Sequence, residues 1–302
     1  MTALENDLMN EFLQRANRML QHIEPLVPKP AEVIDWTQVY AASWQRKGNH
    51  SFFRPIPLGA DIRLADLLGV EQQREQLLRN TQQFMRGFPA NHALLWGARG
   101  TGKSSIVRAL LAEYAEQGLR LIEVERNELA DLPFIVESLA GLPQHFIVFC
   151  DDLSFEAGES DYRILKSVLD GSLERAPDNV LLYATSNRRH LLPEQHSDNQ
   201  HWQHGDGGEL HPSEAVEDKI ALSDRFGLWL SFYPFSQEHY LDVVQHWIAE
   251  YARPTQLAWQ FKEEDAKQAI SWALARGNRN GRCAAQFAKQ WVGLQLLTQT
   301  QE

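Results

Sequence analysis

The sequence predicts an α/β fold, in which a five-stranded parallel sheet is flanked by helices and followed by a C-terminal helical lid domain. Short apolar runs alternate with stretches of helical periodicity through the middle of the chain, a pattern typical of a parallel sheet with helical crossovers. A glycine-rich motif joins one apolar run to its helix, and three helical segments follow the last run.

The glycine-rich motif follows residues 93–96, an apolar run that predicts a buried strand, and a helical pattern continues to Gly118. A strand, the pattern G-x-x-x-x-G-K-S and a helix form the context that a phosphate-binding loop requires. Glycines allow positive φ and bring backbone N–H groups close to phosphate oxygens, and the helix N-terminus adds a partial positive charge. Lys103 is expected to reach the β- and γ-phosphates, and Ser104 to offer its hydroxyl to Mg²⁺. The predicted nucleotide-binding residues are Gly97, Ala98, Arg99, Gly100, Thr101, Gly102, Lys103, Ser104 and Ser105.

Composition narrows the class of protein. The 302 residues are 43% hydrophobic and 23% charged, which is ordinary for a soluble globular chain. Apolar runs are too short to span a bilayer, the first residues do not open a signal peptide, and 2 cysteines are too few for a disulfide framework. We therefore expect a cytoplasmic protein with no membrane partner. A net charge of −11 argues against broad non-specific binding of nucleic acid.

The N-terminal part precedes the predicted sheet. Residues 4–23 carry an apolar stripe, which indicates an amphipathic helix that packs on the protein's own core or docks a partner. Residues 35–56 mix aromatic and basic side chains, which either stack nucleic-acid bases or, as we favour, pack against the neighbouring domain. We expect an N-terminal helix and arm over residues 1–60, a nucleotide-binding domain over 61–234 and a helical lid domain over 235–302.

The apolar run at residues 146–150 ends in two carboxylates. A continuous apolar run indicates a buried parallel strand, and an aspartate at its carboxyl end occupies the Walker B position. Asp151 is expected to hold Mg²⁺, and Asp152 to position or activate the attacking water. Because the Asp152 side chain is one methylene shorter than a glutamate would be, Glu156 is an alternative base.

Further strands are predicted over residues 119–124, 180–187 and 228–232. Asn187 is expected to orient the attacking water or to sense the γ-phosphate, instead of serving only as a turn residue. Arg225 precedes the last strand, where it either completes a neighbour's site as an arginine finger supplied in trans or pairs with Asp224.

Helices are predicted over residues 70–85, within 128–140, and over 160–175, 237–251, 262–275 and 282–297. The segment 64–70 either wraps an adenine or packs in the core. Arg282 opens the last helix and is expected to fold over the γ-phosphate, with Arg279 as the rival for this role.

Residues 190–211 hold several histidines, but their spacings match no compact zinc pattern, so we expect a solvated loop.

The phosphate loop, the Asp151-Asp152 strand end and Asn187 together resemble the AAA+ ATPases. Arg225 before the last strand and Arg282 in the predicted lid strengthen the resemblance. By this resemblance Asn187 takes the sensor-1 place, Arg225 the arginine-finger place and Arg282 the sensor-2 place. The chain departs from the family at Asp152, where the family usually has glutamate.

A narrower resemblance covers the chain from near Trp36 to near the C-terminus. It is to a group of predicted bacterial ATPases that is catalogued only as a domain of unknown function. The similar segments are residues 80–91, 97–105, 151–156, 184–190 and 222–227. The resemblance implies ATP binding, hydrolysis and a five-stranded parallel sheet with a helical lid, but it supplies no substrate.

We therefore expect a Mg²⁺-dependent ATPase that couples hydrolysis to remodelling of a macromolecular partner. It is expected to form a homo-oligomer in which Arg225 acts on the adjacent subunit. The alternative is a nucleotide-switched loader or regulatory binding module with little turnover, which the short Asp152 side chain favours. Nucleic acid is not the favoured partner because the net charge is acidic, although the basic-aromatic segment 44–54 supports it weakly.

Overall fold

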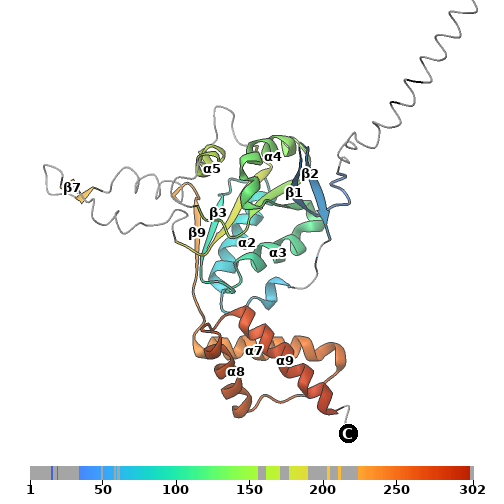
Figure 1. Ribbon diagram of the computed structural model, residues 1–302, viewed down its shortest axis with the longest axis vertical. Coiled ribbons are helices and arrows are strands. Elements are labelled where there is room, and N and C mark those ends of the chain that lie inside the picture. Colours follow the sequence, from blue (N-terminus) through green and yellow to red (C-terminus); the bar gives the residue numbers. More distant parts are fainter. Residues whose placement is uncertain are drawn as a thin grey trace, which may run out of the picture.

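The computed structural model describes residues 15, 19, 34–48, 50–57, 59, 62–155, 161–170, 177–189, 203–204, 210–211 and 224–299. In this part of the chain a seven-stranded sheet carries helices on both faces, and three further helices form a separate group below the sheet (Figure 1). None of the described helices is long and apolar enough to cross a membrane. Glu156 lies outside the described residues. The same holds for most of the predicted helix at residues 4–23 and for most of the histidine-rich segment.

The sheet has the strand order β2-β1-β4-β5-β6-β3-β9. Neighbouring strands pair in parallel, except that β1 and β2 form an antiparallel hairpin. The five predicted strands are confirmed as β3, β4, β5, β6 and β9. The bounds are β1 Ala41–Lys47, β2 His50–Ile56, β3 Ala93–Gly97, β4 Leu119–Glu123, β5 His145–Cys150, β6 Val180–Ser186 and β9 Leu228–Phe232.

Strands β1 and β2 extend the sheet beyond the five that the sequence predicts. Ala41 of β1 pairs with Leu121 of β4, so the expected division at residue 60 leaves two strands of the sheet in the arm. Strand β2 escapes prediction because it is a half-exposed edge strand with no continuous apolar run. Trp44 of β1 is buried, and its Nε1 donates to Asp131 Oδ2 at 2.9 Å, so this aromatic side chain packs within the protein, as we favoured.

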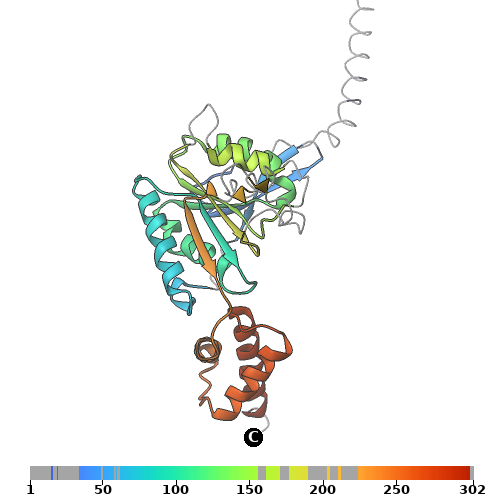
Figure 2. The same cartoon turned by 90° about the vertical axis from the view of Figure 1, so that its left-hand side faces the viewer.

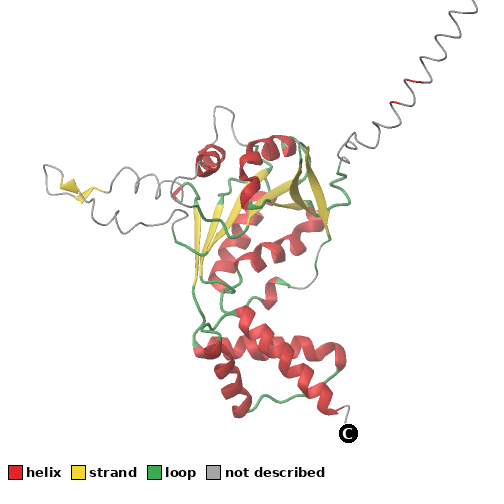
Figure 3. Cartoon of the chain, in the orientation of Figure 1, coloured by secondary structure: helices red, strands yellow, loops and turns green. Residues whose placement is uncertain are grey.

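Two layers of helices cover the sheet, one on each face (Figure 2 and Figure 3). Successive strand residues point to opposite faces. Leu95 of β3 therefore packs with the α2 and α3 layer, whereas Leu94 packs with the α4 and α5 layer. These helices are α2 Glu71–Met85, α3 Lys103–Tyr114, α4 Leu132–Leu139 and α5 Asp161–Asp170, and they confirm the helices predicted in these regions.

The predicted lid is confirmed as the helices α7 Gln237–Ala252, α8 Glu263–Ala275 and α9 Gly281–Gln299. Helix α7 begins after Ser236, whose Oγ accepts a hydrogen bond from the His239 N–H at 3.2 Å and so caps the first turn. Tyr240 of α7 is fully buried, and its hydroxyl donates to the Ala269 carbonyl of α8 at 3.2 Å. This packing holds the three helices together and turns the start of α9 toward the phosphate loop, where the Arg282 N–H meets the Gly100 carbonyl.

Short elements complete the described chain. The 3-10 helices are η2 Leu64–Asp66, η3 Ala115–Gln117, η4 Arg126–Asp131 and η5 Arg253–Thr255. Within the histidine-rich segment, β7 Gln203–His204 pairs in antiparallel fashion with β8 Leu210–His211.

Candidate nucleotide-binding site

A cavity of about 600 Å³ lies between the carboxyl edge of the sheet and the lid. Its lining comes from the phosphate loop, from the ends of β5 and β6, from the segment before α2 and from helices α7 and α9. A volume of this size suits a mononucleotide-sized ligand. The predicted site residues that line it are Arg99, Gly100, Thr101, Gly102, Lys103, Ser104, Ser105, Asp151, Asp152, Asn187 and Arg282.

The backbone of the phosphate loop depends on glycine, as Gly97 and Gly102 show. Gly97 has φ +131°, and a Cβ there would lie 1.9 Å from the Phe232 carbonyl oxygen of β9. The neighbouring Ala98 N–H donates to that same oxygen at 3.0 Å, which ties the loop to the edge of the sheet. Gly102 has φ +103° and directly precedes α3, so the free N–H groups of the first helical turn face the cavity.

Lys103 is 7% exposed, and its ammonium group is held inside the loop. The Nζ atom donates to the Gly97 carbonyl at 2.8 Å and to the Ala98 carbonyl at 2.7 Å. Burial lowers the pKa of Lys103 to about 8, although the carboxylates of Asp152 and Asp151 act in the opposite direction. The loop therefore holds a cation that is costly to bury and that an anion would stabilise.

Three oxygen atoms converge beside this ammonium. Asp151 Oδ1 accepts hydrogen bonds from Ser104 Oγ and from Thr185 Oγ1, both at 2.6 Å. Mg²⁺ prefers hard oxygen ligands and commonly takes one or two from protein while phosphate and water supply the rest. The hydroxyl of Ser104 and the carboxylate of Asp151 are thus a donor set that fits Mg²⁺. Thr185, which sequence reasoning did not single out, orients the carboxylate.

Asp152 lies at the mouth of the cavity with both carboxylate oxygens engaged. Its φ of +52° is unusual for a residue other than glycine and turns the side chain away from the course of the strand. Asn187 Nδ2 donates to Oδ1, and Arg99 Nη2 lies 3.5 Å from Oδ2. Asn187 Oδ1 also accepts from Lys103 Nζ at 3.2 Å, so the predicted residues at the two strand ends meet around the phosphate loop.

The lid contributes directly to the phosphate loop through the start of α9. Asn280 is 8% exposed, and its Nδ2 donates to the Arg99 carbonyl at 2.8 Å while its Oδ1 accepts from the Cys283 N–H at 2.8 Å. The Arg282 N–H donates to the Gly100 carbonyl at 3.2 Å. Sequence reasoning missed Asn280. An asparagine before a helix is a common N-cap, which signals the bond to Cys283 but not the bond to the loop.

The other end of the cavity is apolar. Its walls come from the segment before α2 and from the lid, and the residues are Ile62, Leu67, Leu68, Val70, Phe235, Val243 and Trp247. Apolar walls with aromatic side chains suit a nucleotide base. The segment 64–70, which we considered for adenine, therefore does line the cavity.

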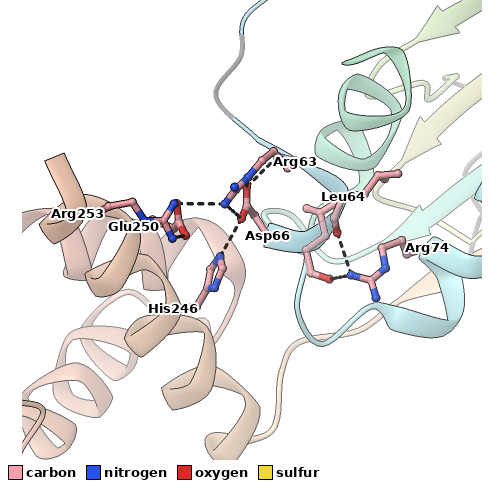
Figure 4. A network of polar contacts seen from close by, with 8 residues as sticks. Arg63, Leu64, Asp66, Arg74, His246, Glu250 and Arg253 are labelled. Carbon is pink, nitrogen blue, oxygen red and sulfur yellow. Dashed lines mark hydrogen bonds and ion pairs between the residues drawn. The ribbon is translucent and has the colours of Figure 1, made fainter. Parts of the chain in front are cut away.

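A polar network beside this apolar end joins the segment before α2 to α7 (Figure 4). Asp66 is 5% exposed; its Oδ1 accepts from Arg63 Nη2 at 2.8 Å and lies 3.2 Å from His246 Nε2. Arg63 also pairs with Glu250 at 3.2 Å. Burial favours the neutral form of Asp66, but the hydrogen bonds and charge of Arg63 outweigh burial and hold the pKa of Asp66 below its ordinary value. The network thus fixes the lid against the sheet domain beside the apolar end of the cavity.

Arg225 lies apart from the other predicted site residues. Its Nε donates to the Asp170 carboxylate at the end of α5, and it is not among the residues that line the cavity. Arg282 lines the cavity, whereas its predicted rival Arg279 does not, although the Arg279 carbonyl accepts from the Phe235 N–H at 2.8 Å.

Comparisons with known proteins agree with this fold. A family model described as "Protein of unknown function (DUF815)" matches residues 37–295. A RuvB mutant from Thermotoga maritima superposes with a TM-score of 0.50 and 16% identity, over 78% of this chain and 67% of that one. Orc1 from Aeropyrum pernix, solved in complex with DNA, superposes with a TM-score of 0.51 and 15% identity, over 80% of this chain and 65% of that one.

At these identities the two similarities show the fold alone. The chain spans 63% to 67% of the length of the matching RuvB chains. No curated protein sequence matches it.

Proposed function

We propose that this chain, which belongs to the DUF815 family, is a Mg²⁺-dependent ATPase that couples hydrolysis to remodelling of a macromolecular partner. One observation carries the proposal: a single cavity gathers the phosphate loop, two acidic residues after β5, Asn187 after β6 and Arg282 of the lid. An apolar end for a base lies beside these groups, which is the arrangement that a nucleoside triphosphate needs.

In this proposal each side chain has a separate task. The loop N–H groups and Lys103 bind the phosphates, and Ser104 and Asp151 would hold Mg²⁺. The ion would neutralise charge that develops on the phosphate oxygens. Asp152 accepts a proton from the attacking water, which Asn187 orients.

Arg282 and Arg225 complete the proposed site. Arg282 contacts the γ-phosphate from the lid of the same chain. Arg225 lies away from its own cavity and pairs with Asp170, so we propose that it serves the cavity of an adjacent subunit in a homo-oligomer. An arginine supplied in trans is typically worth about 10³ to 10⁵ in rate, so turnover is expected to depend on assembly.

The test compares two variants of the full chain with wild type, by calorimetry for ATP binding and by steady-state phosphate release for turnover. Lys103→Ala should lose ATP binding, because the loop cation that faces the phosphates is gone. Asp152→Asn should keep ATP binding within about threefold but lose turnover by at least about 100-fold, since the proton acceptor is removed. Unchanged ATP affinity in Lys103→Ala would contradict the assignment of the loop. Asp152→Asn, held in the ATP state, also provides bait for the unidentified partner.

A second candidate function is a nucleotide-switched loader or regulator with little turnover. The observation in its favour is that both oxygens of Asp152 already have partners, Asn187 and Arg99, which compete with a water molecule for the carboxylate. Phosphate release by wild type separates the two candidates, because sustained turnover above background excludes a pure switch. A salt-dependent shift of labelled single-stranded DNA would identify nucleic acid as the partner in either case.

A further inference from the structure

Arg99 has an anchored backbone and an accessible side chain. Its carbonyl accepts from Asn280 Nδ2 at 2.8 Å, and the next carbonyl, of Gly100, accepts from the Arg282 N–H at 3.2 Å. The side chain, in contrast, is 74% exposed within the lining of the cavity. The lid therefore fixes the point from which the Arg99 guanidinium projects, while the guanidinium itself can change partners.

The partner of that guanidinium is the proposed catalytic carboxylate. Arg99 Nη2 lies 3.5 Å from Asp152 Oδ2, at a distance that allows only a weak ion pair, and the Asp152 side chain is 58% exposed. Exposed pairs of this kind contribute little, because solvent screens the charges and both side chains lose freedom. The pair can therefore be exchanged for a stronger one at small cost.

The terminal phosphate of a nucleoside triphosphate would be a stronger partner. It carries more negative charge than a carboxylate, and its oxygens match the fork of a guanidinium in a bidentate geometry. Lys103 and Arg282 line the same cavity, so the terminal phosphate is expected to lie within a ring of three cations from one chain. A diphosphate lacks the group that would draw Arg99 away.

We propose that Arg99 moves from Asp152 to the γ-phosphate when ATP binds, so that it acts in cis as a catalytic residue and at the same time releases Asp152 to accept a proton. This inference rests on the proposed ATPase function. Water then attacks the γ-phosphorus, and the bond from that phosphorus to the β,γ-bridging oxygen breaks. The bridging oxygen leaves with the electron pair as part of ADP. The water proton goes to Asp152, and ADP and phosphate are the products. Without a triphosphate, Arg99 returns to its weak pair with Asp152 Oδ2.

The first experiment measures the affinities of ATP and ADP in the full-length Arg99→Ala and Arg99→Lys variants. ATP affinity is expected to fall by about tenfold or more in Arg99→Ala, and ADP affinity to stay within about twofold, because only the triphosphate engages the guanidinium. Turnover is expected to fall by about 10² to 10³. Arg99→Lys should recover part of the ATP preference, since it keeps the charge but not the fork. Arg79→Ala, which removes an exposed arginine paired with Glu75 on α2, is the matched control.

A mixing experiment separates action in cis from action in trans. Lys103→Ala chains that retain Arg99 are added to Arg99→Ala chains, and turnover is expected to stay low, because Arg99 serves only its own cavity. The same mixture made with Arg225→Ala chains should regain turnover if Arg225 works in trans.

Three outcomes would overturn the proposal. They are an equal loss of ATP and ADP affinity in Arg99→Ala, an unchanged ATP affinity in Arg99→Ala, and recovery of turnover when Arg99→Ala chains are mixed with Lys103→Ala chains. Failure of wild type to bind ATP would instead overturn the proposed function itself.

Discussion

If the protein binds ATP as proposed, Lys103 makes that affinity depend on pH in a direction that follows from its burial. Its ammonium is buried in the loop, and burial lowers its pKa to about 8. Raising the pH from 7 to 9 therefore converts the group from mostly charged to mostly neutral. A neutral amine cannot pair with a phosphate, whereas a bound phosphate raises the pKa of the ammonium. ATP affinity should change little around pH 7 and should fall as the pH rises through about 8.

The size of the effect follows from the pKa. With a value of about 8, the protonated fraction falls from about nine tenths at pH 7 to about one tenth at pH 9, so the Kd for ATP rises about tenfold. The ligand contributes little to this change, because a phosphate monoester has its second pKa at about 6 and is already mostly ionised at pH 7. The same pKa affects stability. The unfolded chain keeps its lysine protons up to about pH 10.4, so the empty protein gains stability from this group as the pH rises above about 8.

Calorimetry tests the prediction with two independent readouts, the Kd for ATP and the number of protons taken up on binding. At pH 9 binding should take up nearly one proton, which the dependence of the measured enthalpy on the ionisation enthalpy of the buffer reveals. Lys103→Arg keeps its charge at every pH used, so any affinity that it retains should not change between pH 7 and 9. A wild-type Kd that is the same at pH 7 and 9, with no proton uptake, would refute the reasoning.

Two further predictions concern contacts of the lid. Asn280→Ala removes the donor to the Arg99 carbonyl and the N-cap of α9. ATP and ADP should both bind about tenfold more weakly, and the free energy of unfolding should fall by about 1 kcal/mol. Calorimetry that showed a loss of affinity for ATP alone would contradict this prediction. Asp66→Ala should lower the free energy of unfolding by about 1–3 kcal/mol at pH 7, because the substitution leaves Arg63 and His246 without their shared partner. The pKa of Asp66 is lower in the folded state, so its contribution is present above about pH 4 and lost as the pH falls through the folded value. Urea unfolding at pH 7 and at pH 3 should therefore show a gap between variant and wild type that shrinks in acid.

Much of the candidate site could be predicted because its residues stand at places that the chain order defines. Asp151 and Asn187 each follow a buried parallel strand, and parallel strands bring their carboxyl ends to one edge of the sheet. The phosphate loop follows a third such strand, so the order of the strands alone predicts that Asp151 and Asn187 lie near the loop. Local periodicity and one motif are sufficient for this part of the site.

Other features depend on contacts that no local pattern encodes. Arg120 is the second residue of β4 and is 5% exposed, yet an arginine in a strand pattern predicts a solvent-facing position. It is buried because its Nε donates to the Trp36 carbonyl at 2.6 Å and its Nη1 to the Ala115 carbonyl at 2.8 Å. One of these partners comes from the segment before β1, whose place beside the sheet the sequence does not reveal. The pairing of Arg99 with Asp152 is hidden for the same reason.

The contact between the lid and the phosphate loop has a consequence for how such a protein responds to a partner. A phosphate loop must turn its N–H groups toward the anion, which leaves its carbonyls facing the other way in need of donors. The carbonyls of Arg99 and Gly100 find these donors in Asn280 and in the backbone of Arg282, both at the start of α9. Displacing α9 would leave these carbonyls unpaired, so under the proposed function a partner that pulled on the lid would weaken phosphate binding. Because such coupling is reciprocal, bound phosphate must hold α9 in place with the same free energy.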